Sequence, residues 1–159
     1  MCVFRPRIKV FICAPGKEQS AKIAREKIFE IFDLFPLLKR ELVGEGNFGS
    51  DYVKLTFRNG SIFDVVSALN SQRGGRRAAG ILDEYRDHSP DQLNSIVLPL
   101  LNVSRKMVNG LENPYEPHQV QIWISSASDK NTFCYDKTIE LLELSIINPA
   151  KAFTFGCTY

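Results

Sequence analysis

Two adjacent carboxylates stand at the end of a short apolar run. Residues 79–82 (Ala-Gly-Ile-Leu) are followed directly by Asp83 and Glu84. A short apolar run between polar residues is typical of a strand buried on both faces, and open α/β sheets bind ligands at the carboxyl ends of such strands. There, Asp83 could hold Mg²⁺ through its water shell, and Glu84 could orient and deprotonate an attacking water. The pair also suits a strand that simply ends in a solvated acidic turn.

Further polar clusters follow other predicted strands. Cys13, with Gln19 just beyond it, lies at the carboxyl end of one strand, and the sequence Ser-Ser-Ala-Ser (125–128) follows another. In a parallel sheet these clusters and the acid pair would gather at one edge. The loop before the acid strand carries three arginines, Arg73, Arg76 and Arg77. Carboxylates, hydroxyls and guanidinium groups are the parts that phosphoryl transfer needs, so their co-location favours a nucleotide site.

The order of the elements predicts an α/β fold. Strand patterns occur at residues 8–14, 52–57, 62–66, 79–82 and 119–124, and helical patterns at residues 18–32, from 90 onward and at 129–147. Asn59 and Gly60 predict a tight hairpin turn, since both readily take positive φ angles. Pro99 should kink its helix or end it early. Strands that alternate with helices indicate a mostly parallel sheet flanked by helices.

Length and composition are those of one soluble globular domain over residues 1–159. The chain is 44% hydrophobic and 24% charged, and 159 residues can bury a sizeable core. A net charge of +2 does not indicate nucleic-acid binding by bulk electrostatics, so any basic surface must be local. The four cysteines form no CxxC pair, which predicts a reducing, cytoplasmic compartment, with Cys13 and Cys134 as buried thiols. No stretch approaches the length of a membrane span.

Taken in order, the motifs over roughly residues 8–130 resemble the ATPase domain of the large terminase subunit, the DNA-packaging motor of tailed bacteriophages. The matching segments are residues 12–21, the hairpin at 55–62, residues 67–70, the basic loop at 72–77, a Walker B run at 80–84 and a coupling motif at 124–127. Their shared order and spacing carry the resemblance. It implies a RecA-like P-loop NTPase core of the ASCE type with an inserted β-hairpin.

The resemblance implies a role for each matching acid and polar residue. Asp83 would bind Mg²⁺, and Glu84 would be the catalytic carboxylate. Gln19, Ser125 and Ser126 would face the ATP, and the two serines would also couple its hydrolysis to movement. The implied activity is ATP hydrolysis that drives double-stranded DNA into a procapsid.

The basic loop has two implied uses. One of Arg73, Arg76 or Arg77 would act as an arginine finger, in its own subunit or toward a neighbour in a homo-oligomeric ring. The same arginines also suit DNA phosphate, because guanidinium groups serve both purposes. The family's partners are double-stranded DNA, a portal protein and a small terminase subunit, in the cytoplasm of a bacterial host and without a membrane.

The chain departs from the family's pattern in two places. It contains no GxxxxGK[ST] motif, the Walker A loop whose backbone amides and lysine cradle the phosphates of ATP. Residues 15–17 (Pro-Gly-Lys) lack the leading glycine and the hydroxyl of that loop. The family's nuclease domain, which would follow Tyr159, is absent too. We therefore expect a fragment, a truncated prophage gene or one piece of a split gene, which lacks the first strand, P-loop and helix and does not hydrolyse ATP alone.

Two other functions compete with this interpretation. Asp83 and Glu84, with Ser126 and Ala127, also resemble the Asp-Glu and Ser-Ala-Thr motifs of DEAD-box helicases, whose core fold is shared. A second RecA-like domain would follow a helicase core, whereas a nuclease domain follows a terminase core. The other alternative is a degenerate α/β remnant that serves only as a binding or assembly surface. Titration with nucleotide and Mg²⁺ separates an ATPase from such a remnant.

Overall fold

The structure, a computed structural model, describes residues 1–66, 76–116 and 119–156. The chain forms two compact units, residues 1–124 and residues 125–159. The first unit holds the sheet and the predicted acid pair, and the second contains α3 (Phe133–Ile147). Among the described residues, no helix is long and apolar enough to span a membrane.

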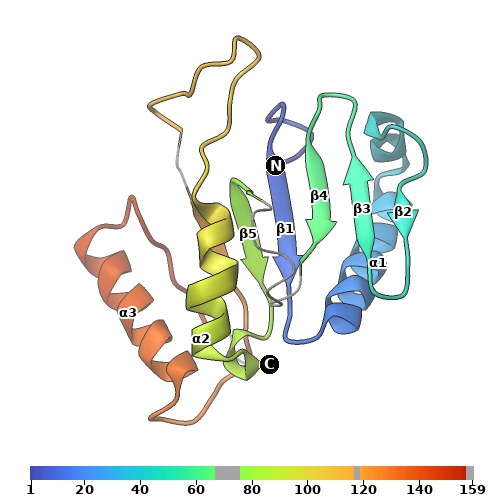
Figure 1. The fold of residues 1–159 in the computed structure, drawn as a ribbon. Helices are drawn as coiled ribbons and strands as arrows, with labels where there is room; N and C mark the ends of the chain where they lie inside the picture. The colour runs from blue at the N-terminus through green and yellow to red at the C-terminus, as the bar shows by residue number, and fades with distance from the viewer. Residues whose placement is uncertain (67–75, 117–118, 157–159) are drawn as a thin grey trace. The chain divides into compact units, whose positions relative to one another are not determined.

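Within the described residues, six strands form one mixed sheet in the first unit (Figure 1). They are β1 (Lys9–Cys13), β2 (Asn47–Phe48), β3 (Val53–Thr56), β4 (Ile62–Val65), β5 (Ala79–Leu82) and β6 (Val120–Trp123), in the order β2-β3-β4-β1-β5-β6. β4, β1, β5 and β6 run parallel, and β2 and β3 join antiparallel at one edge. The expected α/β fold with a mostly parallel sheet is confirmed. The carboxyl ends of β1 and β5 are neighbours. β2 lies within residues 44–49 (Gly-Glu-Gly-Asn-Phe-Gly), whose composition predicts a loop.

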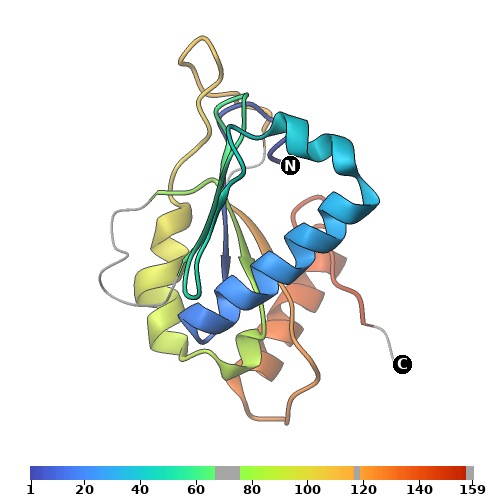
Figure 2. The ribbon, with the colours of Figure 1, turned by 90° about the vertical axis from the view of Figure 1, so that its right-hand side faces the viewer.

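Helices cover both faces of this sheet (Figure 2). On one face, the buried side of α1 (Lys17–Leu34) packs against strand residues in a cluster that includes Ala21, Ala24, Ile28 and Phe32 with Ile12, Val53, Leu55 and Val65. On the other face lies a helical segment of residues 90–101, whose Leu93, Val97 and Leu101 are fully buried. Because β1 and β5 are central and covered on both faces, the apolar run that leads to Asp83 is buried, as expected for a parallel sheet.

Pro99 shapes the helical segment over the second face. α2 (Pro90–Gln92) continues into a π-helical turn (Leu93–Val97) and a 3₁₀ turn (Leu98–Leu101), so the helix is irregular and ends two residues after Pro99. Proline has no N–H for the regular i→i−4 bond, and the backbone changes its hydrogen-bond spacing around it. The expected early end is confirmed.

The expected helix of residues 129–147 starts later than predicted. α3 begins at Phe133, because Thr132 takes an extended backbone and its hydroxyl accepts a hydrogen bond from the amide of Tyr135 at 3.3 Å. A threonine at this position satisfies one of the free amides of the first helical turn.

The β3–β4 hairpin forms at the predicted place but with a different turn. Gly60 has φ +82°, whereas Asn59 does not take a positive φ. The amide of Gly60 donates to the carbonyl of Phe57 at 2.9 Å, and the amide of Phe57 donates to the carbonyl of Ser61 at 2.9 Å. This is a three-residue turn with one left-handed glycine, so the prediction that both central residues take positive φ is wrong.

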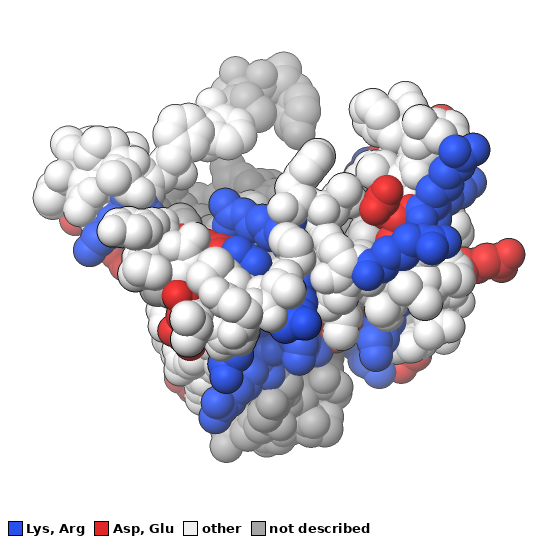
Figure 3. Space-filling model, turned by 90° about the horizontal axis from the view of Figure 1, so that it is seen from above, with Lys and Arg blue, Asp and Glu red and all other residues white. Residues whose placement is uncertain are grey.

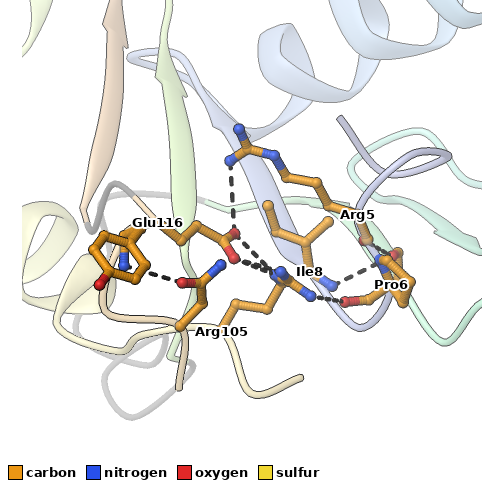
Figure 4. Close-up of polar contacts among 8 residues, drawn as sticks. Arg5, Pro6, Ile8, Arg105 and Glu116 are labelled. Atoms are coloured by element: carbon orange, nitrogen blue, oxygen red, sulfur yellow. Dashed lines mark hydrogen bonds and ion pairs between the residues drawn. The ribbon is translucent and has the colours of Figure 1, made fainter. Parts of the chain in front are cut away.

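An arginine–glutamate cluster ties the N-terminal segment to residues 105–116 (Figure 4). Arg105 Nε donates to Glu116 Oε1 at 2.8 Å, and Arg105 Nη1 donates to the carbonyl of Pro6 at 2.9 Å. Arg5 Nη1 lies 3.6 Å from Glu116 Oε1. The side chains of Arg105 and Glu116 are 12% and 11% exposed, so their charges compensate each other in a largely desolvated place. Arg5 and Pro6 come just before β1, and Asp83 follows the end of β5 beside it, so the cluster lies at the end of the sheet opposite Asp83.

Candidate active site

Asp83 lies where β5 ends beside β1. Its amide donates to the carbonyl of Cys13 at 2.8 Å, so the last hydrogen bond between these strands holds the Asp83 backbone. The carboxyl is partly buried, and this burial is the main cause that raises its pKa above the ordinary value. The neighbouring Glu84 carboxylate raises the pKa further, and hydrogen bonding to the Glu84 backbone lowers it. A partly buried carboxylate at the end of a strand is a suitable partner for a hydrated cation.

Glu84 has a left-handed backbone, with φ 46° and ψ 47°. This conformation costs a residue with a Cβ about 1–2 kcal/mol, and such strain concentrates at functional sites. Arg86 Nε lies 3.7 Å from Glu84 Oε2 and 3.5 Å from Asp87 Oδ1, so a guanidinium group stands close to the predicted catalytic carboxylate. Sequence reasoning missed Arg86, although an arginine two residues after an acid is a visible signal.

A short 3₁₀ turn (Tyr85–Asp87) carries the chain away from the acids. The amide of Tyr85 donates to the carbonyl of Ile124, just after β6, at 3.2 Å. The buried Tyr85 ring meets Trp123 edge-on, with ring centroids 5.3 Å apart and planes at 87°. β6 therefore supports the turn through both backbone and side chain.

His88 stands next to Asp87 in a charged stretch of the sequence, which predicts a surface residue at the entry to a helix, but it is buried at the end of this turn. Its side chain is 5% exposed, and Nε2 lies 3.3 Å from the carbonyl oxygen of Asp83. Burial lowers the pKa of His88, and hydrogen bonding to the backbone of Asp83 and Cys13 acts in the opposite direction. The surface interpretation is wrong, because the chain after Tyr85 folds back toward the ends of β1 and β5.

The loop from β1 into α1 forms the neighbouring part of the same sheet edge. The buried Ser20 hydroxyl accepts a hydrogen bond from the amide of Ala14 at 2.7 Å and donates to the carbonyl of Gly16 at 2.9 Å. Lys17 Nζ pairs with Asp51 Oδ2 at 2.7 Å. Gln19, a predicted nucleotide contact, is exposed on the first turn of α1. Its role stays a prediction.

The predicted arginines are placed differently from the acids. Arg76 is exposed and Arg77 precedes β5, whereas Asp83 follows it, so their backbones lie at opposite ends of that strand. Arg77 forms a two-pronged ion pair with Asp64 of β4; its Nε donates to Asp64 Oδ1 at 3.0 Å. Arg73 lies outside the described residues. The structure thus brings Asp83 and Glu84 together but does not bring Arg77 to them.

Ser125 and Ser126, the predicted coupling residues, directly follow Ile124 and begin the second unit. They belong to that unit, whereas Asp83 and Glu84 belong to the first. The predicted contact of the two serines with nucleotide stays a prediction. The second unit also contains the buried thiol of Cys134, and Cys13 is fully buried in the first. The expectation of two buried thiols is confirmed.

The donor set fits one particular kind of metal binding. Within the described part of the chain, no group of three or more His, Cys, Asp or Glu side chains could hold a metal ion. Mg²⁺ needs fewer protein ligands when it arrives with a nucleotide, because it is then bound by one or two carboxylates, water and phosphate oxygens. Asp83 and Glu84 fit this second case and do not fit a resident metal.

The sequence matches no protein-family model and no curated protein. Three solved phage proteins match its fold: the large terminase of bacteriophage HK97, with a TM-score of 0.60 over 91% of this chain at 18% identity; the large terminase of a thermophilic bacteriophage, with 0.55 over 96% at 11%; and the large terminase ATPase domain of Thermus phage P74-26, with 0.52 over 80% at 19%.

The chain spans 27%, 33% and 51% of those three solved chains, respectively. Their likeness concerns the fold: the α/β sheet with its flanking helices is that of large terminase ATPase domains. The expected resemblance is therefore confirmed at the level of the fold.

Proposed function

We propose that the chain is part of a DNA-packaging motor ATPase of the large terminase type. The observation that carries the proposal is the turn at Asp83 and Glu84, where two carboxylates follow a buried central strand and the second has a strained, left-handed backbone. The likeness of the fold to large terminases supports it.

The two acids divide the chemistry between them. When Mg²⁺ and ATP are bound, the metal neutralises charge on the phosphates. Asp83 would hold the metal's water shell, and Glu84 would orient the attacking water and take its proton.

This chain contributes only one side of such a site. The GxxxxGK[ST] motif that would bind the phosphates is not in the sequence. We propose that the loop is supplied by a further polypeptide segment, and that the 159 residues alone do not turn over ATP. Gln19, Ser125 and Ser126 remain the proposed nucleotide contacts, and Arg73 or Arg76 is the proposed arginine finger.

Contacts with double-stranded DNA are proposed for exposed basic side chains. Figure 3 views the end of the molecule at which β1 and β5 begin, and Lys and Arg side chains form several groups on it. At this end Arg7 Nη1 contacts the carbonyls of Met107 and Val108 at 3.5 and 3.4 Å, and its side chain is exposed. A portal protein, a small terminase subunit and a ring of copies, in the cytoplasm of a bacterial host, complete the proposal.

The test is an ATPase assay on the chain joined to the coding region that precedes Met1. We expect that region to supply a GxxxxGK[ST] loop and the joined protein to hydrolyse ATP, with kcat at least about 100-fold lower in Glu84→Gln and Asp83→Asn. Asp91→Asn, an exposed acid on α2, is the matched control. An unchanged kcat in Glu84→Gln would overturn the proposal.

A second function is favoured by the missing phosphate loop: a binding or assembly module without catalysis. It predicts that no joined form hydrolyses ATP and that Mg²⁺-ATP does not bind the chain in calorimetric titration. A helicase-like ATPase is distinguished by the following coding region, which would then hold a second RecA-like domain instead of a nuclease.

A further inference from the structure

The imidazole of His88 closes the turn that carries the two acids. Its Nε2 stands 3.3 Å from the carbonyl oxygen of Asp83, within hydrogen-bond reach, and the side chain is almost fully buried. The amide of the same Asp83 donates to the carbonyl of Cys13 at 2.8 Å. The ring therefore lies against the last hydrogen bond that joins β1 to β5, five residues further along the chain than Asp83.

The turn between these residues needs external support, because its backbone at Glu84 is left-handed and strained. On one side the support comes from Tyr85, whose amide donates a hydrogen bond to the carbonyl of Ile124 and whose ring contacts Trp123. On the other side the amide of His88 donates to the carbonyl of Tyr85 at 3.3 Å, and its ring returns to Asp83. His88 thus links the two ends of the six-residue turn.

We propose that His88 is a positioning residue that sets the direction of the Asp83 and Glu84 carboxylates by holding the Asp83 carbonyl. The proposal rests on the proposed function for the catalytic meaning of those acids, but its geometry can be tested without nucleotide. His88 acts through the backbone: Nε2–H donates to the Asp83 carbonyl, which fixes the peptide group between the acids. In this role it does not touch the reacting atoms.

The fluorescence of Trp123, the only tryptophan of the chain, provides the readout, because its ring packs against Tyr85 and Tyr85 belongs to this turn. In the intact 159-residue chain, His88→Leu keeps the bulk of the ring and removes its donor, whereas His88→Gln keeps a side-chain N–H that can reach the same carbonyl. We expect His88→Leu to shift Trp123 emission to longer wavelength and to increase its quenching by acrylamide. His88→Gln should behave as the wild type, and far-UV circular dichroism verifies that both are folded.

If His88→Leu does not fold, the comparison of His88→Gln with the shorter His88→Asn decides, and only Gln should retain the wild-type emission. The proposal is overturned if His88→Leu leaves the Trp123 signal unchanged, or if Gln disturbs it as much as Leu or Asn, since the ring would then act by packing alone.

A second measurement separates this proposal from the proposed function. In the joined ATPase, a carboxylate misplaced by about 1 Å lowers the rate about 100-fold, so His88→Leu should lower kcat with KM for ATP unchanged, and His88→Gln should restore it. If Glu84→Gln has no effect on the ATPase, the proposed function fails, while the Trp123 result in the isolated chain still decides the role of His88.

Discussion

Arg77 reaches across β1 to pair with Asp64, so that an arginine just before β5 is anchored on β4. The two side chains are 16% and 15% exposed, and the guanidinium donates through Nε and Nη2 to both carboxylate oxygens. A paired and largely buried arginine is a structural part of the sheet. This separates Arg77 from the exposed Arg76, although the sequence presents them as equivalent neighbours.

Arg77→Met should therefore destabilise the chain by about 3 kcal/mol, because it leaves the Asp64 carboxylate desolvated and unpaired. Asp64→Asn in the same background should recover most of that loss, since no uncompensated charge remains. Urea unfolding measures both. Arg76→Met, an exposed control, should stay within about 0.5 kcal/mol of the wild type. An Arg77→Met chain as stable as the wild type would show that the ion pair with Asp64 does not stabilise the sheet.

The strained backbone of Glu84 can be measured by comparing two substitutions. Both Glu84→Gly and Glu84→Ala remove the carboxylate, but only glycine adopts the left-handed conformation without steric cost. We expect the glycine variant to be more stable than the alanine variant by about 1 kcal/mol in urea unfolding. Equal stabilities would mean that residue 84 does not hold this conformation in solution.

Gly80 is required by the close packing of β5 on β1. A Cβ at this position would lie 2.5 Å from Phe11 Cζ, and the Phe11 ring is fully buried. Gly80→Ala should therefore cost about 2 kcal/mol of unfolding free energy. The double variant Gly80→Ala/Phe11→Leu should lose about 1 kcal/mol less unfolding free energy than the sum of the losses in the two single variants. Strict additivity in this double-mutant cycle would contradict the contact.

The Cys13 thiol predicts a loss of stability at alkaline pH. Burial raises its pKa from 9.0 to about 12, so the folded chain keeps the proton that the unfolded chain releases. The stability that folding gains from the protonated Cys13 thiol is fully present below pH 9 and is lost as the pH rises toward 12. The free energy of unfolding of the wild type should fall more steeply over this range than that of Cys13→Ala. Parallel pH profiles would show that Cys13 is not buried in the folded chain.

Most elements near the site were predictable because their signals are local. The apolar run at 79–82 coincides with β5, and the acids follow it at the carboxyl end. Pro99 ends its helix by a property of its own ring. The hairpin was found, yet its turn was wrong, since Asn59 can adopt either sign of φ and the strand pairing selected one.

The sequence by itself determined that Asp83 and Glu84 end a buried strand and stand together, because an apolar run followed by two charges allows few other arrangements. Only the tertiary structure decided which neighbours act on them. It brought the buried His88 ring to the Asp83 carbonyl, drew Arg77 to Asp64 and gave Glu84 its left-handed backbone. The Arg77–Asp64 pair depends on β1 lying between β4 and β5, and the His88 contact depends on how the turn after β5 folds back onto the ends of β1 and β5. No periodicity or spacing along the chain records that geometry.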